Sequence, residues 1–131
     1  MLLRRICMTS KLAMIAAGAL LALGGTARAE PDAKLGEAVF KKACGACHTT
    51  EAAKHKIGPS LHGIVGRHSA TVANFQYSEA MKKADKTWDG KTLDTYLANP
   101  RELIPNTKMI FPGLKNAQER ENLIAFLEAQ K

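Results

Sequence analysis

The segment Cys44-Gly-Ala-Cys47-His48 places two thiols and an imidazole side by side. Such a group can be a redox-active dithiol, half of a zinc site, or an attachment point for haem. A thioredoxin-like dithiol lies between a strand and a helix, and no strand pattern precedes Cys44. A zinc site needs a second ligand pair, and no further cysteine pair follows. The motif therefore favours a c-type haem, whose two vinyl groups take up the thiols while His48 binds the iron.

The sixth iron ligand decides what such a haem can do. With His48 alone the iron would be open to small ligands, as in a haem enzyme or a gas sensor. Met81 lies in a short helical pattern that is typical of packing. Met109 lies in the non-helical segment Ile104–Gly113, which prolines stiffen on both sides. We therefore predict Met109 as the sixth ligand, and the enzyme or sensor with an open or displaceable sixth site is the alternative.

Residues 1–29 have the three parts of a secretory signal. Basic residues come first, an uncharged apolar run follows at residues 12–25, and Ala27-Arg28-Ala29 supplies small residues where a signal peptidase reads. The apolar run is shorter than the ~20 residues that span a bilayer, which disfavours a retained anchor. We predict cleavage before Glu30, leaving residues 30–131 as one domain in the oxidising periplasm.

Charge and the remaining histidines exclude other classes of function. The whole chain has 19 basic and 12 acidic residues, a net charge of +7, but four of the basic residues belong to the leader. Residues 30–131 therefore carry 15 basic against 12 acidic residues, or +3. No basic run is interleaved with aromatic residues, so we expect no nucleic-acid partner. The other histidines are interpreted as loop or surface residues: His55, His62 and His68.

The elements that must position this chemistry are short helices. Asp32 is a plausible N-cap for a helix that runs into Cys44, and later helices are predicted over residues 78–85 and 89–99 and from Asn116 onward. Pro100 is expected to end the third of these. No stretch shows strand alternation, and residues 49–74 are interpreted as loop. The sequence thus predicts an all-α fold whose long loops wrap around a large apolar cofactor.

The ordered motifs resemble class I c-type cytochromes, specifically the group of mitochondrial cytochrome c and bacterial cytochromes c2. The resemblance covers nearly all of residues 30–131. The matching stretches are Cys44–His48, Ile57–Arg67, Phe75–Ser78, Thr87-Trp88, Tyr96–Pro100, Ile104–Leu114 and Glu121–Leu127.

The resemblance implies the small class I cytochrome c fold around one haem c, attached through Cys44 and Cys47. It implies His48 and Met109 as axial ligands, with the Pro59 carbonyl hydrogen-bonded to the other ring nitrogen of His48. The remaining implied roles are a propionate contact for Arg67, Tyr77 and Trp88, a hydrogen bond near the Met109 sulfur for Tyr96, support of the Met109 loop by Thr107, and a close helix crossing at Gly36.

Two stretches depart from the family pattern. The loop 68–74 lacks the glycines that relatives carry there, and we expect Asn74 to take a left-handed conformation. Met81 stands where relatives often have asparagine near the haem.

The function implied is that of a soluble periplasmic electron carrier, not an enzyme, without stable membrane insertion and monomeric. The compatible partners are a cytochrome bc1 complex as donor and a terminal oxidase, photosynthetic reaction centre or periplasmic reductase as acceptor. A weakly basic haem-edge face is expected to steer docking; its residues are Lys54, Lys56, Arg101, Lys108 and Lys115.

Overall fold

The computed structural model describes residues 28–131, so the predicted leader lies outside the described residues except for its last two. The helices are α1 (Ala33–Ala43), α2 (Glu79–Lys83), α3 (Gly90–Ala98), α4 (Pro100–Leu103) and α5 (Ala117–Glu128). Between residues 28 and 131 the chain forms no strand, only one isolated bridge between His68 and Thr87. None of the described helices combines the length and apolar character needed to cross a bilayer. The all-α prediction is confirmed.

Short polar side chains start the helices where the sequence predicts. The Asp32 carboxylate accepts a hydrogen bond from Lys34 N at 2.7 Å and opens α1. Ser78, Asp89 and Asn116 open α2, α3 and α5 in the same way. Each cap satisfies backbone N–H groups that a helix start leaves without a partner.

Two helix boundaries differ from the prediction. Pro100 follows α3 as expected, but it also begins the short helix α4, because proline suits the first position of a helix. The helix α2 ends at Lys83, before the predicted Asp85. Asp85 itself has φ 48°, a left-handed conformation that cannot continue a helix.

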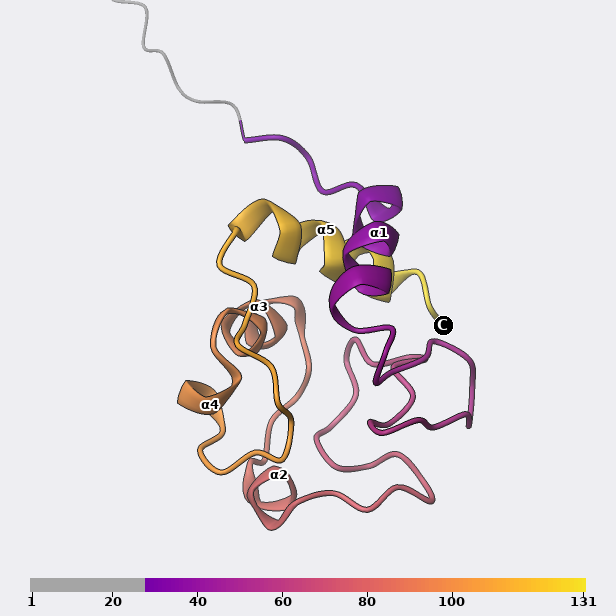
Figure 1. The fold of residues 1–131 in the computed structure, drawn as a ribbon, viewed down its shortest axis with the longest axis vertical. Coiled ribbons are helices and arrows are strands. Elements are labelled where there is room, and N and C mark those ends of the chain that lie inside the picture. The colour runs from indigo at the N-terminus through magenta and orange to yellow at the C-terminus, as the bar shows by residue number, and fades with distance from the viewer. Residues whose placement is uncertain (1–27) are drawn as a thin grey trace, which may run out of the picture.

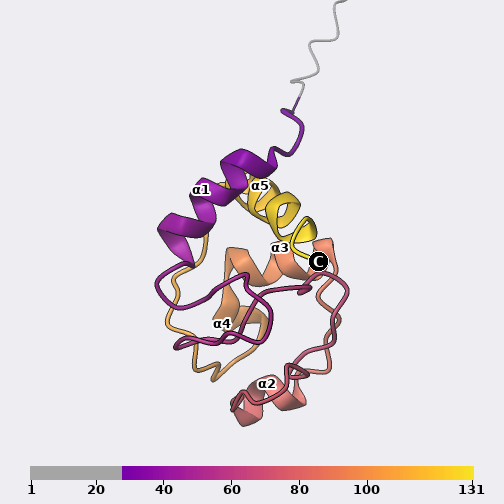
Figure 2. The same ribbon diagram turned by 90° about the vertical axis from the view of Figure 1, so that its right-hand side faces the viewer.

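The crossing of α1 and α5 forms one end of the molecule in both views (Figures 1 and 2). The rings of Phe40 and Phe126 pack with their centroids 5.4 Å apart, and Leu123 is completely buried. At Gly36 the helices touch so closely that a Cβ atom would lie 2.5 Å from the carbonyl carbon of Asn122. Because α1 runs directly into Cys44, this crossing sets where the two thiols and His48 lie.

The two long loops that carry the predicted ligands lie on opposite sides of the lower half of the molecule (Figure 1). Residues 44–62, in purple to magenta, face the viewer in Figure 2, and residues 104–114, in orange, lie behind them. The helix α3 backs this region, with the ring of Tyr96 against Trp88 at a centroid distance of 4.9 Å. The fold therefore places the loop with His48 on one side of this region and the loop with Met109 on the other.

The loop 68–74 turns through two left-handed residues that are not glycine. Asn74 has φ 58°, as expected, and Ala70 has φ 57° in the same left-handed region. One backbone and one side-chain hydrogen bond hold the loop's base: Ser69 N donates to Lys86 O at 2.7 Å, and the Ser69 hydroxyl accepts from Lys86 N at 3.1 Å. These bonds fix the residue next to Ala70, whose left-handed conformation is one that alanine ordinarily avoids.

Candidate functional site

A tight turn after α1 brings the two thiols and the imidazole together. Cys47 N and His48 N both donate to the carbonyl of Cys44, at 3.0 and 2.9 Å. Both thiols are free, and burial together with the neighbouring Cys47 raises the pKa of Cys44 to about 11. A dithiol oxidoreductase needs a thiol with a lowered pKa, so this environment argues against a redox-active dithiol.

The His48 ring is fixed in one orientation. Its Nδ1 lies 2.8 Å from the carbonyl oxygen of Pro59, the arrangement that the resemblance implies. A carbonyl can only accept, so Nδ1 carries the proton and Nε2 carries the lone pair. Burial lowers the pKa of His48; the hydrogen bond to Pro59 opposes this shift, and the charge of Lys56 adds to it. Because the net shift is downward, the ring is neutral at pH 7. The backbone of Gly58 passes against the ring, where a Cβ atom would lie 2.6 Å from Nδ1.

Met109 is on the opposite loop, where it lies beside Thr107 of the same loop and Tyr96 of α3. The Tyr96 hydroxyl points at the Met109 sulfur from 3.9 Å, and Met109 N donates to the Thr107 hydroxyl at 3.4 Å. Burial raises the pKa of Tyr96, and a hydrogen bond with Thr107 opposes that rise. The structure thus brings together all three residues that the sequence predicts for this side of the site.

The loop carrying Met109 is anchored at both ends. Ile104 N donates to Pro100 O at 2.9 Å, and Leu114 N donates to Leu97 O at 2.8 Å. Gly113 has φ 91° and lies so close to the end of α3 that a Cβ atom would overlap the last carbonyl of that helix. A flexible methionine is therefore presented on a segment that has little freedom.

Arg67, Tyr77 and Trp88 lie close together. The Arg67 guanidinium donates to the carbonyls of His62 and Ser60 at 2.8 and 3.1 Å, and Trp88 N donates to Arg67 O at 2.9 Å. Burial raises the pKa of Tyr77, against a hydrogen bond from Val72 and the charge of Arg67. Two N–H groups of the Arg67 guanidinium are thus used by backbone carbonyls. The contact of Arg67 with a propionate stays a prediction.

No motif in the sequence points to a role for His55. Its Nδ1 accepts from Ser60 N at 3.1 Å, so Nε2 carries the proton and donates to Ala73 O at 3.0 Å. His55 is a loop residue, as interpreted, but it also ties the segment after the thiols to the loop 68–74. Both partners are backbone atoms, which no side-chain pattern announces.

The basic residues predicted to ring the haem edge are partly engaged. Lys54 pairs with Glu51 at 2.8 Å, and Lys115 donates to Ala98 O at 3.0 Å. Arg101 borders a shallow hollow of about 390 Å³ beside Ile110, which is 91% exposed. An apolar spot beside a cation is typical of a small docking surface.

The donor set fits haem c. Two thiols in one turn suit thioether attachment, a neutral imidazole has its lone pair on Nε2, and a thioether lies on the opposing loop. The sequence also matches the Cytochrome c family over residues 33–131. The chain belongs to the cytochrome c family. Haem c is covalently attached in this family, and Cys44 and Cys47 stand at the attachment motif.

Individual relatives support the same assignment. This cytochrome c is 49% identical over 98 residues to cytochrome c of Nigella damascena and 50% identical over 99 residues to that of Guizotia abyssinica. These alignments cover 74 and 75% of this chain and 88 and 89% of the relatives. Cytochrome c 2.1 of Caenorhabditis elegans is 46% identical over 99 residues, covering 76% of this chain and 89% of the relative.

A solved structure confirms the fold. Cytochrome cH from Methylobacterium extorquens superposes with a TM-score of 0.70 at 37% sequence identity. The match covers 75% of this chain and 98% of that protein. The predicted small class I cytochrome c fold is therefore confirmed, and the family's function as haem electron carriers applies to this chain.

Proposed function

We propose that this cytochrome c is an exported, monomeric carrier that moves single electrons in the periplasm through a haem ligated by His48 and Met109. The observation that carries the proposal is the His48 Nδ1 hydrogen bond to Pro59, at 2.8 Å. It leaves a lone pair on Nε2, the form of imidazole that binds iron. Met109, held beside Tyr96 and Thr107, supplies the second donor.

The bound haem would supply one-electron redox chemistry at its iron. Met109 would hold the iron together with His48, and its thioether would favour the reduced state and keep substrates from the iron. Tyr96 and Thr107 hold the thioether in place, and Pro59 holds the imidazole. Arg67, Tyr77 and Trp88 would receive a propionate: Trp88 N donates to Arg67 O and the charge of Arg67 acts on Tyr77, so the three residues lie near one another, and a buried carboxylate needs donors.

We further propose that its partners are a cytochrome bc1 complex as donor and a terminal oxidase, reaction centre or reductase as acceptor. Docking would use the exposed Ile110 with Arg101 and the neighbouring lysines. With a predicted charge of only +3 and Lys54 already paired, steering should be modest. Reduction by an isolated bc1 complex should slow as ionic strength rises, and a rate independent of salt would contradict this docking face.

Export and processing need a separate test. The leader pattern predicts that the protein recovered from a bacterial periplasm begins at Glu30. Intact mass spectrometry of the haem-containing protein gives the N-terminus directly. A protein that keeps residues 1–29 and sediments with membranes would support the retained anchor instead.

The ligation is tested by spectroscopy on the purified holoprotein. We expect pyridine-haemochrome absorbance to survive acid washing of the denatured protein, because thioethers keep the haem attached. The ferric protein should show the weak far-red band of methionine ligation. That band should vanish in Met109→Ala and persist in Met81→Leu, a matched control. A wild type that lacks the band and binds carbon monoxide readily would favour a haem enzyme or sensor.

A further inference from the structure

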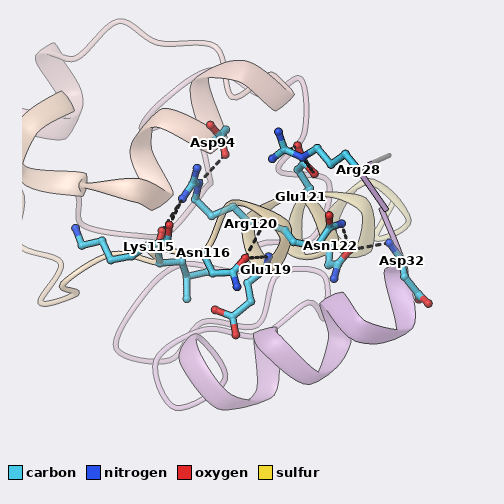
Figure 3. Close-up of polar contacts among 11 residues, drawn as sticks. Arg28, Asp32, Asp94, Lys115, Asn116, Glu119, Arg120, Glu121 and Asn122 are labelled. Carbon is cyan, nitrogen blue, oxygen red and sulfur yellow. Dashed lines mark hydrogen bonds and ion pairs between the residues drawn. The ribbon is translucent and has the colours of Figure 1, made fainter. Parts of the chain in front are cut away.

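Arg120 joins three parts of the fold with one guanidinium group. Its Nε lies 2.6 Å from the Asp94 carboxylate, and the same side chain donates to the carbonyls of Leu114 and Lys115 at 2.8 and 3.1 Å. Figure 3 shows this side chain between Asp94 and the start of α5. The Arg120 side chain is only 12% exposed, although its Asp94 partner is 43% exposed. A mostly buried arginine with three partners is more than a surface ion pair.

These partners belong to α3 and to the end of the Met109 loop. Asp94 lies in the middle of α3, whose last turn also receives Leu114 N. Leu114 is therefore hydrogen-bonded at both its N–H and its carbonyl. The Lys115 carbonyl accepts from Arg120, and the Lys115 ammonium group donates to the carbonyl of Ala98 at the end of α3. Arg120 thus fastens the C-terminal end of the loop to the helix that carries Tyr96.

The chain from this anchor back to Met109 is short and stiff. Between Met109 and Leu114 lie Ile110, Phe111, Pro112 and Gly113. Proline has a fixed φ, and Gly113 is pressed against the end of α3. Ile110 is 91% exposed, so it adds little burial to hold the loop. The position of the Met109 sulfur therefore depends strongly on how well the loop's end is fixed.

We propose that the Asp94–Arg120 pair is a positioning device that sets how firmly Met109 is retained at the haem. This inference rests on the proposed ligation by Met109. Arginine stays charged at any working pH, and a charged donor makes stronger hydrogen bonds than a neutral one. Without the guanidinium, two carbonyls at the loop's end lose their shared donor, and the state with Met109 detached becomes easier to reach.

The test is an imidazole titration of the ferric holoprotein, followed by loss of the far-red band. Imidazole binds only where Met109 has left, so its apparent Kd falls as the detached fraction grows. We expect Arg120→Gln to lower this Kd about tenfold, which corresponds to ~1.4 kcal/mol. Asp94→Asn should lower it about twofold or more, because a neutral partner holds the guanidinium less firmly. Arg120→Lys should fall between wild type and Arg120→Gln.

A matched control comes from the next residue of α5. Among the residues that the structure describes, Glu121 forms no hydrogen bond or ion pair with the Met109 loop; it pairs with Arg28 at 2.7 Å, which belongs to the predicted leader (Figure 3). Glu121→Gln should leave the imidazole Kd unchanged. Amide hydrogen exchange separates a local from a global effect: in Arg120→Gln the Leu114 amide should exchange faster, while that of the fully buried Leu123 keeps its rate.

Two failures are distinguishable. A wild type without the far-red band refutes ligation by Met109 and this inference with it. A wild type with the band, combined with an unchanged imidazole Kd in Arg120→Gln and Asp94→Asn, refutes only the positioning role. Equal acceleration of exchange at Leu114 and Leu123 also overturns it, because the pair would then support the whole fold. If Arg120→Gln does not fold, Asp94→Asn carries the test alone.

Discussion

Gly36→Ala is the substitution that tests the crossing of α1 and α5 most sharply. The added Cβ atom would lie 2.5 Å from the carbonyl carbon of Asn122 and 2.8 Å from the Cβ of Phe126. Non-bonded carbons prefer ~3.5–4.0 Å, so the helices would have to separate by roughly 1 Å. The obstacle includes backbone, which cannot rotate out of the way as a side chain can.

The expected cost follows from this separation. Overpacking a tight core costs ~1–3 kcal/mol. Separation also loosens the Phe40–Phe126 contact and the packing of the buried Leu123. We set this loss of stability at about 2 kcal/mol, a fraction of the burial energy of these side chains. The higher helix propensity of alanine offsets ~1 kcal/mol of this loss of stability. The net loss is about 2–4 kcal/mol, a large share of the ~5–15 kcal/mol that stabilises a typical protein.

The assay is guanidinium denaturation of the ferric holoprotein followed by circular dichroism. The midpoint should fall with an unchanged slope, because the surface exposed on unfolding stays similar. Gly90→Ala is the matched control: it begins α3, and its Cβ would meet Ile124 at an ordinary 3.9 Å. That variant should be as stable as wild type or gain up to ~1 kcal/mol. A Gly36→Ala protein within about 0.5 kcal/mol of wild type would refute the close crossing.

Two further predictions concern the loop 68–77. Ala70→Gly should stabilise the protein by about 1 kcal/mol in the same denaturation assay, because alanine at φ 57° is strained. As a control, Ala125→Gly within α5 should destabilise it by about the same amount. An Ala70→Gly protein that is less stable than wild type would contradict the left-handed turn. Tyr77→Phe should flatten the alkaline limb of the stability–pH curve. Burial raises the folded pKa of Tyr77 above its ordinary 10.0, so the unfolded chain releases this proton first, and wild-type stability is complete below pH 10 and falls as pH rises through the folded pKa. Identical alkaline limbs in thermal melts of the two proteins would show that Tyr77 is not buried in this way.

Much of the fold could be predicted because its signals are local. The cap at Asp32 and the apolar spacing after it lie within one helix, so the sequence alone placed α1 and its connection to Cys44. Helix ends do not follow from local signals alone. Pro100 is compatible with both an end and a start, and the end of α2 depends on the left-handed Asp85, whose conformation is set by its neighbours in space.

The candidate site divides in the same way. The thiols and His48 form one contiguous motif, and Met109 stood out as a methionine in a stiff, non-helical segment. The clamps made by His55, Arg67 and Arg120 were not predicted, because each binds backbone carbonyls that only the fold brings within reach. A carbonyl is present at every residue, so the sequence does not show which of them will be used.

Iron K-edge X-ray absorption of the purified ferric holoprotein tests the central claim most directly. Ligation by His48 and Met109 predicts a sulfur atom in the first coordination shell of the iron, lost in Met109→Ala and retained in Met81→Leu. A wild-type shell of nitrogen and oxygen alone, or a sulfur that persists in Met109→Ala, would contradict it.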